Sequence, residues 1–388
     1  MTDTLGLDRS KYRILLMSTG GGIGGEESFT ANLGESLLRR GWDVRVAARS
    51  PVHMEDLRRR GLRVEDLGLW GKRPAQLWLG ARSLARYASR EGIHVLHAQS
   101  AGPGVMAIIA KWLRLFSRPR PAIMWHDHGI TYYGLISKLF NQLDVSIANS
   151  DFEKNKLMAH GLRPDKVVRV HNGIDTCKLS VTADERARRR AKVRQEFGWE
   201  DGTPVAGFVG RLSPEKAPDD FVASFRRARE LLPDVRYLVI GDGAMRPHLE
   251  QMIRDMNAEK QIILTGFRRD IPDLLCGIDA LALVSHMETF SLTTLEAMAM
   301  HLPCVVTNTG GSPEQVTDGE NGHVVPDRSP DRIAEALVDI LADPARRQAY
   351  GEAGHQRVVT YLNIERMVDE IEGVYCDLLR RNSHLKTG

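Results

Sequence analysis

Short apolar runs alternate along the chain with longer segments whose apolar residues recur every three or four positions. The runs predict buried strands, and the periodic segments predict helices with one apolar face. Within residues 11–50, the run in KYRILLMS leads through glycines into a helix that carries on one face Phe29, Leu33, Leu37 and Leu38. Further strands are predicted at 42–48, 94–98, 122–125, 144–148 and 167–170. Such strand–loop–helix–strand units build doubly wound parallel sheets.

A second series of the same units begins at Pro204. Its strands are predicted at 205–209, 237–240, 262–265, 281–284 and 303–306, and its helices at 218–231, 245–257, 270–276, 330–342, 344–360 and 363–381. A chain of 388 residues exceeds one hydrophobic core of ordinary size. The sequence therefore predicts an α/β protein with two Rossmann-like domains. The heavily charged segment 182–200 is expected to be a solvated helix and linker.

Composition narrows the class of protein. The hydrophobic fraction of 42% and the charged fraction of 27% are those of a globular chain, and a net charge of +3 is too small to indicate nucleic-acid binding. Four separated cysteines without a CxxC pair indicate reduced thiols. The first residues, MTDTLGLDRSKY, contain no apolar stretch, and no run approaches the roughly 20 residues of a membrane span. We therefore expect a cytoplasmic protein that at most contacts the inner face of the membrane.

A glycine loop at 20–25 precedes the first predicted helix. Its backbone amides suit an anion, and a simple tight turn is the alternative interpretation. The second strand leads into Ala47, Ala48 and Arg49, without the acidic residue that a dinucleotide-binding fingerprint places there. A nicotinamide cofactor is therefore not expected.

Two carboxylates follow the strand at 281–284. Glu288 lies in the loop at the carboxyl end of that strand, and Glu296 lies eight residues later, in a helix that begins near Ser291–Thr293. Both are expected to face the crevice in which open α/β sheets bind ligands. As alternatives, Thr293 and Glu296 fit a capping box that only satisfies helix-start amides, and Glu288 could be a solvated loop charge.

The stretch ETFSLTTLEAMA, which starts at Glu288, resembles the E-G-F-G-L-x-x-L-E-A-M-A pattern of glycosyltransferase family 4. Thr289 and Ser291 stand where two glycines are usual, and the two carboxylates keep their spacing. The GGSPE segment at 310–314 is also similar to the family. The resemblance implies the GT-B fold, in which two Rossmann-like domains face each other across a cleft.

The resemblance also implies different roles for the two domains. Residues 1–180 would form an acceptor-binding domain onto which a C-terminal helix within 370–388 crosses back, and residues 181–369 would bind the nucleotide sugar. The implied activity is that of a retaining, metal-independent glycosyltransferase without a cofactor. A UDP-sugar is the expected donor, with a GDP-sugar as the alternative, and a lipid-linked or cell-envelope glycan is the expected acceptor. The other hypotheses are a small soluble acceptor such as an antibiotic or thiol precursor, a sugar-nucleotide epimerase, and a non-catalytic sensor.

Several donor contacts follow from the resemblance. It implies that Glu288 holds hydroxyl groups of the donor sugar, that Glu296 accepts a hydrogen bond from the ribose, and that Arg268 lies where relatives contact the base. The implied donor-binding residues are Gly24, Gly25, Arg211, Lys216, Gly266, Arg268, Glu288, Phe290, Ser291, Leu292, Thr293 and Glu296.

Cleavage of the sugar–phosphate bond places negative charge on the leaving diphosphate. The chain contains no Asp-x-Asp to hold a metal ion, so no metal site is expected, and a basic pair with helix-start amides is the other solution. Arg211 and Lys216 match the family's G-R-L-x-x-x-K diphosphate pair, with a solvated loop as the alternative. The implied catalytic residues are His126, Arg211, Lys216 and Glu288.

His126 follows the strand predicted at 122–125. By its place it matches the family's histidine near the transferred sugar, and it is expected to face the cleft. Asp127 or His128 could take this role instead, and a satisfied polar loop is the competing interpretation. A metal site is not expected, because adjacent side chains of an extended strand point apart. The implied acceptor-binding residues are Gly25, Glu26, His126, Asp127 and His128.

Residues 104–120 are basic and aromatic, with no acidic residue among them. The segment interleaves Lys111, Arg114, Arg118 and Arg120 with Trp112, Leu113, Leu115 and Phe116. A helix of this kind could lie on anionic lipid. The alternative is a surface helix whose apolar face packs inward.

Overall fold

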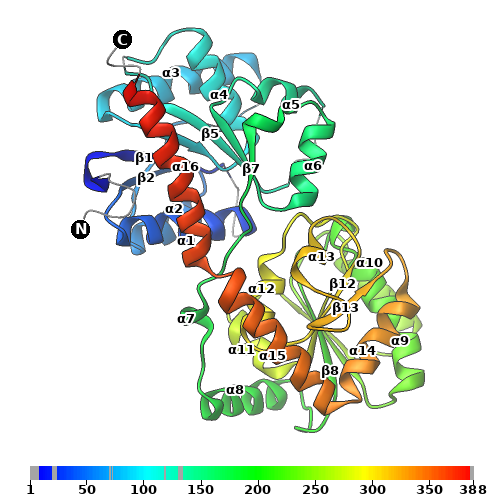
Figure 1. Cartoon of the computed structure of the whole chain (residues 1–388). Helices are drawn as coiled ribbons and strands as arrows, with labels where there is room; N and C mark the ends of the chain where they lie inside the picture. The colour runs from blue at the N-terminus through cyan, green and yellow to red at the C-terminus, as the bar shows by residue number, and fades with distance from the viewer. Residues whose placement is uncertain are drawn as a thin grey trace. The chain divides into compact units, whose positions relative to one another are not determined.

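The predicted apolar runs form strands of two parallel sheets in the computed structural model, which describes residues 8–19, 24–69, 71, 73–117, 119–129 and 134–384. The chain divides into two compact units: the first comprises residues 1–172 and 364–388, and the second comprises residues 173–363 (Figure 1). The two Rossmann-like domains expected from the sequence are confirmed. The sequence-based boundaries, 180 and 369, lie slightly later along the chain.

The sheet of the first unit has the strand order β3-β2-β1-β4-β5-β6-β7. Its strands are β1 (Arg13–Met17), β2 (Asp43–Ala47), β3 (Arg63–Glu65), β4 (Val95–Ala98), β5 (Ala122–Asp127), β6 (Val145–Ala148) and β7 (Val167–Arg169). Ile14 and Leu16 of β1 face one apolar layer, and Leu15 and Met17 face the other. Helices cover both layers, which explains why the strands are apolar on both faces.

The helices of this unit are η1 (Arg9–Lys11), α1 (Gly25–Arg39), α2 (Pro51–Arg59), α3 (Pro74–Glu91), α4 (Ala101–Trp112), α5 (Gly134–Phe140), α6 (Asp151–Ala159), η2 (Pro164–Lys166) and α16 (Ile364–His384). Phe29, Leu33 and Leu37 of α1 are buried as predicted. Leu38 was predicted on the same face, but it is 38% exposed, because one further residue turns a side chain by about 100° around the helix axis.

Helix α16 packs beside α1 of the first unit (Figure 1). Its buried Glu372 accepts a hydrogen bond from Trp42 Nε1 at 2.6 Å. Arg9 and Arg40 donate to the other carboxylate oxygen of Glu372 at 3.0 and 2.9 Å. The last helix of the chain is thus fixed to the first unit by a buried, fully paired carboxylate.

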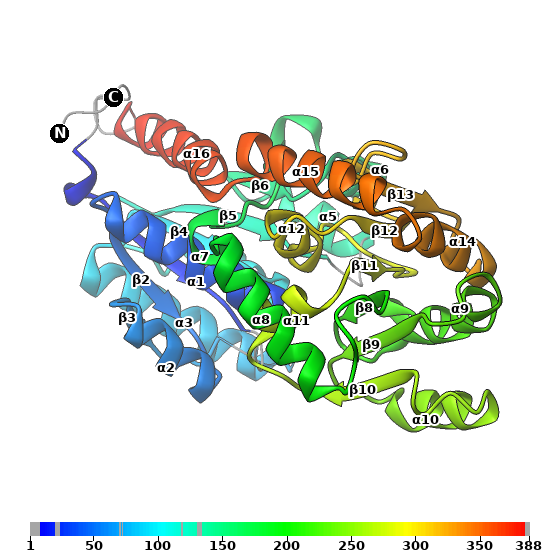
Figure 2. The ribbon, with the colours of Figure 1, turned by 90° about the horizontal axis from the view of Figure 1, so that it is seen from below.

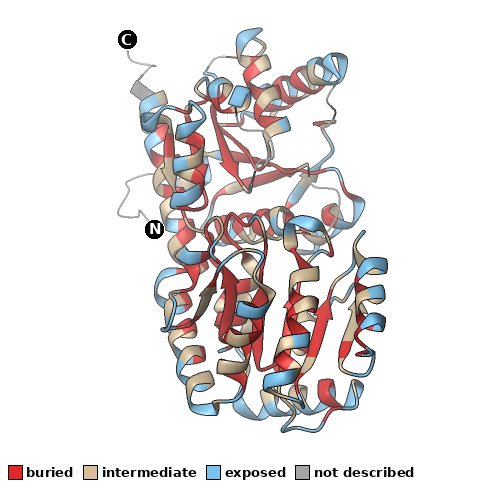
Figure 3. Cartoon of the chain, turned by 90° about the vertical axis from the view of Figure 1, so that its right-hand side faces the viewer, coloured by how far each residue is buried: buried red, intermediate tan, exposed pale blue. Residues whose placement is uncertain are grey.

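The sheet of the second unit has the strand order β10-β9-β8-β11-β12-β13. Its strands are β8 (Val205–Val209), β9 (Arg236–Ile240), β10 (Ile262–Gly266), β11 (Ala280–Leu283), β12 (Cys304–Thr307) and β13 (Gly322–Val325). Its helices are α7 (Thr176–Leu179), α8 (Ala183–Glu196), η3 (Pro214–Lys216), α9 (Pro218–Leu231), α10 (Arg246–Asp255), α11 (Ile271–Gly277), α12 (Leu292–Ala299), α13 (Ser312–Gln315), α14 (Pro330–Leu341) and α15 (Pro344–Tyr361). Figure 3 shows that the strands are buried and that the outer faces of the helices are exposed.

The segment 182–200, predicted to be a solvated helix and linker, is helical as expected, but it is not solvated throughout. The segment forms α8, which packs along α11 of the second unit (Figure 2). Arg194 of α8 is only 1% exposed, and its guanidinium donates to Asp279 Oδ2 at 2.8 Å and to the carbonyl groups of Glu200 and Thr203. The charge of Arg194 predicts a solvated side chain. The arginine is buried instead, because it pairs with the buried carboxylate of Asp279.

Candidate functional site

Glu288 and Lys216, which were predicted to serve the same ligand, form an ion pair. Lys216 ends η3 in the loop after β8, and Glu288 lies in the loop after β11, the neighbour of β8 in the sheet. Lys216 Nζ donates to Glu288 Oε2 at 2.6 Å, and Glu288 is only 8% exposed. The carboxyl ends of neighbouring parallel strands meet at one edge of a sheet, so the two loops converge where α/β sheets bind ligands.

Arg211 lies on the same loop as Lys216, and its side chain is exposed. Burial acts to raise the pKa of Glu215 between them, but the Ser213 hydroxyl and the charges of Arg211 and Lys216 lower it overall. The Ser213 hydroxyl donates to Glu215 Oε1 at 2.6 Å. Because Lys216 also pairs with Glu288, the exposed Arg211 is the cation of this loop that is left to attract an anionic ligand.

The backbone of Glu288 is held by the glycines that follow β12. The Gly311 amide donates to the Glu288 carbonyl at 3.0 Å. Gly310 has a φ of 57°, and a Cβ at this position would lie 1.6 Å from the Glu288 carbonyl oxygen. Only glycine tolerates both this backbone conformation and this close approach. The GGSPE segment therefore clamps the Glu288 loop.

Polar side chains hold the two ends of the same loop. The hydroxyl groups of Thr307 and Thr309 donate to the Ser285 carbonyl at 2.6 and 2.8 Å. Gln315 of α13 accepts from the Ser291 amide at 3.0 Å and donates to the Ser291 carbonyl at 2.7 Å. Gln315 was not predicted as a site residue, because no local pattern marks a side chain that binds backbone 24 residues away.

The capping-box interpretation of Glu296 is wrong. Ser291, where the family pattern has glycine, caps α12 by accepting from the Thr294 amide at 3.2 Å. The partly exposed carboxyl group of Glu296 has no hydrogen-bond partner within the described part of the chain, and burial raises its pKa to about 7. Glu296 thus offers a largely desolvated acceptor that the helix start does not use.

Arg268, which was predicted to lie near the nucleotide base, is engaged by two carboxylates. Its Nε and Nη2 donate to Asp270 at 2.8 and 2.6 Å, and Nη1 and Nη2 donate to Glu196. Hydrogen bonds to Asp270 and Glu196 raise the pKa of Arg268. Gly266 before it has a φ of 73°. A nucleotide base could therefore contact the Arg268 guanidinium only while Asp270 and Glu196 also bind it.

His126 is completely buried, which corrects the expectation that it faces a cleft. Strand β5 extends to Asp127, two residues further than predicted, and places His126 inside the unit. The His126 ring stacks between His97 of β4 and His128, with ring centroids 5.7 and 4.6 Å away and interplanar angles of 9° and 14°. Burial lowers the pKa of His97 and of His128 to about 3 and that of His126 well below its ordinary value. The three stacked rings are therefore neutral at neutral pH.

His128 lies just after β5 and is partly exposed. Its Nε2 lies 3.0 Å from Oε1 of the buried Gln99. A hydrogen bond between this nitrogen and the buried Gln99 amide fixes the rotation of the His128 ring. The sequence analysis missed Gln99, whose importance depends on β4 and β5 being neighbours.

Asp127, the other candidate at this edge, is buried. Its Oδ1 accepts from the Gly129 amide at 2.9 Å. Burial, followed by the hydrogen bond to the Glu153 carboxyl and that group's charge, raises the pKa of Asp127 well above its ordinary value. Because the carboxyl group is buried and one of its oxygens binds the Gly129 amide, Asp127 is poorly suited to contact an acceptor.

The predicted N-terminal loop is described only in part, because residues 20–23 lie outside the described residues. Gly24 is the N-cap of α1, and Gly25 is its first residue. Glu26 Oε1 accepts from the Ser18 hydroxyl at 2.9 Å and from the Thr19 amide at 3.2 Å. Glu26 thus fixes the start of α1 to the carboxyl end of β1.

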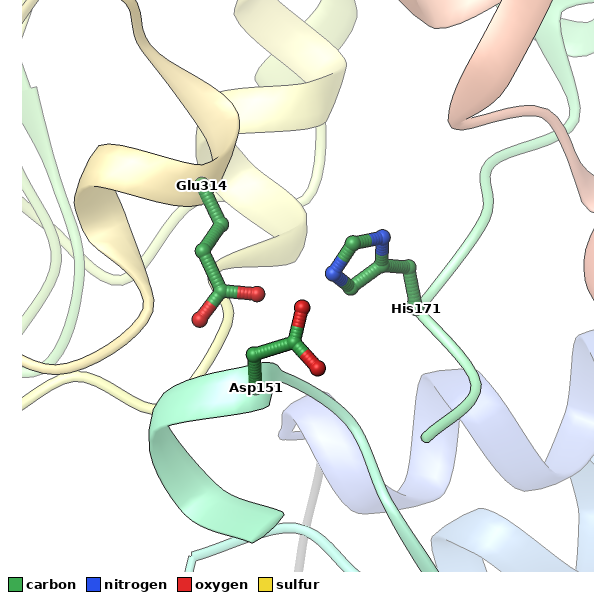
Figure 4. Close-up of side chains that lie close together, drawn as sticks. All are labelled: Asp151, His171 and Glu314. Atoms are coloured by element: carbon green, nitrogen blue, oxygen red, sulfur yellow. The ribbon is translucent and has the colours of Figure 1, made fainter. Parts of the chain in front are cut away.

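Two further polar clusters lie outside the predicted set. In the first unit, Arg169 Nε lies 3.5 Å from Asp151 Oδ1, and Arg169 Nη1 lies 3.3 Å from His171 Nδ1. Figure 4 shows the side chains of Asp151 and His171, and also that of Glu314, which belongs to α13 of the second unit.

The second cluster lies wholly in the second unit. His286 Nδ1 lies 2.7 Å from Asp327 Oδ1 and 3.9 Å from Asp220 Oδ2. Ligand atoms of these three residues lie within 4.8 Å of one another, so they could hold a divalent cation. Because His286 precedes Glu288 by two residues, its hydrogen bond also ties the Glu288 loop to the segment after β13.

The basic segment 104–120 forms α4 and the turn that follows it, apart from Arg118, which lies outside the described residues. Met106 and Ile108 are buried, so the apolar face packs inward. Trp112 and Leu113 at the end of α4 are 56% and 50% exposed. No described helix is both long enough and apolar enough to cross a membrane.

Helix α3, which the sequence analysis did not single out, presents a similar surface. Trp78 and Leu79 are 44% and 59% exposed, and the Arg82 guanidinium lies 4.6 Å from the centre of the Trp78 ring. A groove of about 740 Å³ along α3 is lined in part by Glu65, Asp66, Trp78, Arg82, Arg86 and Arg90.

Two protein-family descriptions match successive parts of the chain. The family described as Glycosyltransferase Family 4 matches residues 23–178, and the family described as Glycosyl transferases group 1 matches residues 189–357. The chain is 24% identical over 375 residues to N-acetyl-alpha-D-glucosaminyl L-malate synthase of Bacillus anthracis, covering 94% of this chain and 97% of the synthase. It is 26% identical over 313 residues to UDP-Gal:alpha-D-GlcNAc-diphosphoundecaprenol alpha-1,3-galactosyltransferase of Escherichia coli, covering 76% and 79% of the two chains.

Solved structures share the fold. Anabaena Alr3699/HepE in complex with UDP and glucose matches with a TM-score of 0.82 and 21% identity, over 94% of this chain and 99% of that one. Sucrose-phosphate synthase from Thermosynechococcus elongatus matches with a TM-score of 0.78 and 20% identity, over 95% and 100% of the two chains. At these identities the likeness concerns the fold alone.

Proposed function

This chain belongs to glycosyltransferase family 4, and we propose that it transfers a sugar from a nucleotide diphosphate sugar, in the first place a UDP-sugar, to a hydroxyl group of an acceptor. The observation that carries the proposal is the Lys216–Glu288 pair, which joins the loops after β8 and β11 beside the exposed Arg211. The positive charges of Arg211 and Lys216 suit the negative charge of a diphosphate. The carboxylate of Glu288 suits the hydroxyl groups of a sugar, because it accepts hydrogen bonds.

In the second unit, we assign one or more residues to each part of the nucleotide sugar. Arg211 and Lys216 bind the diphosphate, and Glu288 accepts hydrogen bonds from hydroxyl groups of the sugar. Glu296 accepts from the ribose, and the amides of 290–293 meet the donor. An ammonium group has three donors and a carboxylate has about four acceptor positions, so the Lys216–Glu288 bond can persist while both side chains bind the ligand.

The proposed reaction needs no metal ion. The acceptor hydroxyl attacks the anomeric carbon on the face that the leaving phosphate vacates, and a phosphate oxygen takes the hydroxyl proton. The carbon–phosphate-oxygen bond breaks, the new glycosidic bond forms on the same face, and configuration is retained. Arg211 and Lys216 stabilise the charge of the leaving diphosphate, and one such preorganised donor lowers a barrier by roughly 3 kcal/mol.

In the first unit we propose that His128, not His126, contacts the transferred sugar or the acceptor. His128 is partly exposed, and the hydrogen bond between its Nε2 and Gln99 orients the ring. His126 lies behind it in the stack. Gly25 and Glu26 remain proposed neighbours of the acceptor, and the Asp127 carboxyl is used within the fold.

Two acceptor classes are supported by different relatives. The name of the Escherichia coli relative includes a diphosphoundecaprenol acceptor, which supports a lipid-linked or cell-envelope glycan intermediate. The name of the Bacillus anthracis relative includes L-malate, and this match extends over nearly all of both chains, which supports a small soluble acceptor as the second candidate.

A lipid-linked acceptor entails contact with the inner face of the membrane. We propose that the end of α4 provides this contact, because Trp112 and Leu113 are exposed beside the exposed Arg114.

Flotation with anionic vesicles tests the proposal: the wild-type protein should float, and Trp112→Ala/Leu113→Ala should float less. Leu231→Ala, which removes an exposed leucine of the second unit, is the control. Equal flotation of all three proteins would contradict the proposal.

The activity is tested by mass spectrometry of the purified protein with UDP- and GDP-sugars, first alone and then with a polyprenyl diphosphate sugar or with L-malate. A transferase should slowly hydrolyse one donor and form a glycoside with one acceptor. Release of an isomeric sugar nucleotide would indicate an epimerase, and binding without turnover would indicate a sensor.

A further inference from the structure

Helix α16 contacts the histidine stack of the first unit at His97. Tyr375 of α16 is completely buried, and its hydroxyl lies 2.7 Å from His97 Nδ1. The rings of Tyr375 and His97 also meet edge to face, at 5.7 Å and 80°. Because His97, His126 and His128 follow as nearly parallel rings, a continuous row of side chains runs from α16 to the sheet edge.

His126, in the middle of this row, is oriented by packing. Neither of its ring nitrogens has a hydrogen-bond partner among the described residues, and Phe29 meets its ring edge-on at 4.6 Å. A buried nitrogen without a partner loses its hydrogen bonds to water and destabilises the folded state, and an apolar ring of similar size would avoid this loss. The imidazole at this position therefore calls for a role besides filling space.

We propose that Tyr375 is a positioning residue for His128 that acts through His97 and His126; the proposal rests on the role of His128 given above. The hydrogen bond between Tyr375 and His97 Nδ1 fixes the rotation of the His97 ring. The flat face of His97 limits the tilt of His126, which in turn supports the plane of His128. The hydrogen bond to Gln99 fixes the rotation of the His128 ring, so the plane and the rotation of this ring are set by different residues.

Tyr375→Phe tests the proposal, because it removes the hydroxyl and keeps the ring that packs against Trp42. In the full-length protein we expect kcat to fall about tenfold, since small misplacements of a reacting group have effects of this order. The Kd for UDP should stay within about twofold, because the residues proposed to bind the diphosphate and the ribose lie in the second unit. The ring ¹⁵N resonances of His128, recorded without substrate, should shift.

Tyr237→Phe is the matched control. It removes another buried tyrosine hydroxyl, which lies 3.0 Å from Ser224 Oγ in the second unit. This variant should lose stability without any change in the His128 resonances. If Tyr375→Phe does not fold, His97→Gln replaces it: the amide keeps a partner for Tyr375 but removes one ring of the stack, so the same loss of kcat and the same spectral change are expected.

The outcomes separate two claims. If His128→Ala leaves kcat intact, the proposed role of His128 is wrong, and the positioning proposal falls with it. If His128→Ala lowers kcat while Tyr375→Phe changes neither kcat nor the His128 resonances, only the positioning proposal is overturned.

Discussion

The carboxyl group of Glu296 keeps its proton up to about pH 7 in the folded protein, because it is largely buried and accepts no hydrogen bond within the described part of the chain. In the unfolded chain it ionises near its ordinary value of 4.5. Between these values the folded state binds more protons, so the contribution of Glu296 to stability is lost as pH rises. Above about pH 7 the buried, ionised carboxylate of Glu296 therefore destabilises the folded protein. A hydrogen bond from a ribose hydroxyl would reduce this destabilisation.

Glu296→Gln is predicted to stabilise the ligand-free protein at pH 8 by about 1–2 kcal/mol, after allowance for solvent screening, and to change little at pH 4.5. The same variant should bind UDP more weakly, because the amide replaces a charged acceptor. Thermal unfolding at the two pH values, with UDP titration at pH 8, measures both effects. A variant that is equally destabilised at both pH values would contradict the prediction.

At the scale of elements, the loop after β11 depends on the loop after β12. Gly310→Ala is predicted to lower turnover by more than about tenfold, because a Cβ cannot fit 1.6 Å from the Glu288 carbonyl oxygen, and displacement of that loop moves Glu288.

Gly319→Ala is the control for Gly310→Ala. Its φ of 75° is also left-handed, but no atom lies within 4 Å of its added Cβ. It should cost only the backbone strain, about 1–2 kcal/mol of stability, with turnover retained. Unfolding curves and initial rates for both variants distinguish the clash from the strain, and similar rates in the two variants would show that the clamp is unimportant.

Local patterns predicted many elements closely. The apolar run at 205–209 and the segment from Pro218 to Leu231 coincide with β8 and α9, because an uninterrupted apolar run and a proline at a helix start act locally. The three-residue strand β3 has no fully buried residue and escaped notice.

The candidate site was predictable only where a family pattern spans it. The Lys216–Glu288 contact joins residues 72 positions apart, and each was predicted from its own motif. Gln99 and Gln315 belong to no motif, and their roles arise from neighbouring strands and loops. His126 was expected at the end of its strand, facing the cleft, because the apolar run ends at Trp125. The strand instead continues through His126, which the interior accepts in its neutral form.

At the scale of the whole molecule, the chain leaves the first unit after residue 172 and returns to it at residue 364. Glu372 of the returning helix α16 is buried with three donors. Glu372→Ala is predicted to lower the free energy of unfolding by about 3 kcal/mol, because it leaves buried donors without their carboxylate.

Glu370→Ala serves as the control for Glu372→Ala. It breaks only a pair with Arg366 one turn away on the same helix, and it should cost less than about 0.5 kcal/mol. Urea unfolding measures both variants, and equal losses would mean that the buried network does not anchor α16.

The central claim is that the second unit grips a nucleotide diphosphate sugar through Lys216 and Glu288. It is tested most directly by calorimetric titration of UDP together with turnover in Lys216→Ala and Glu288→Ala, with Lys260→Ala, an exposed lysine of the same unit, as the control. Lys216→Ala should weaken UDP binding by at least about tenfold and abolish turnover, since it removes a charge-assisted bond. Glu288→Ala should abolish turnover with a smaller effect on UDP binding, and Lys260→Ala should behave as wild type. Undiminished UDP binding and turnover in both Lys216→Ala and Glu288→Ala would contradict the account.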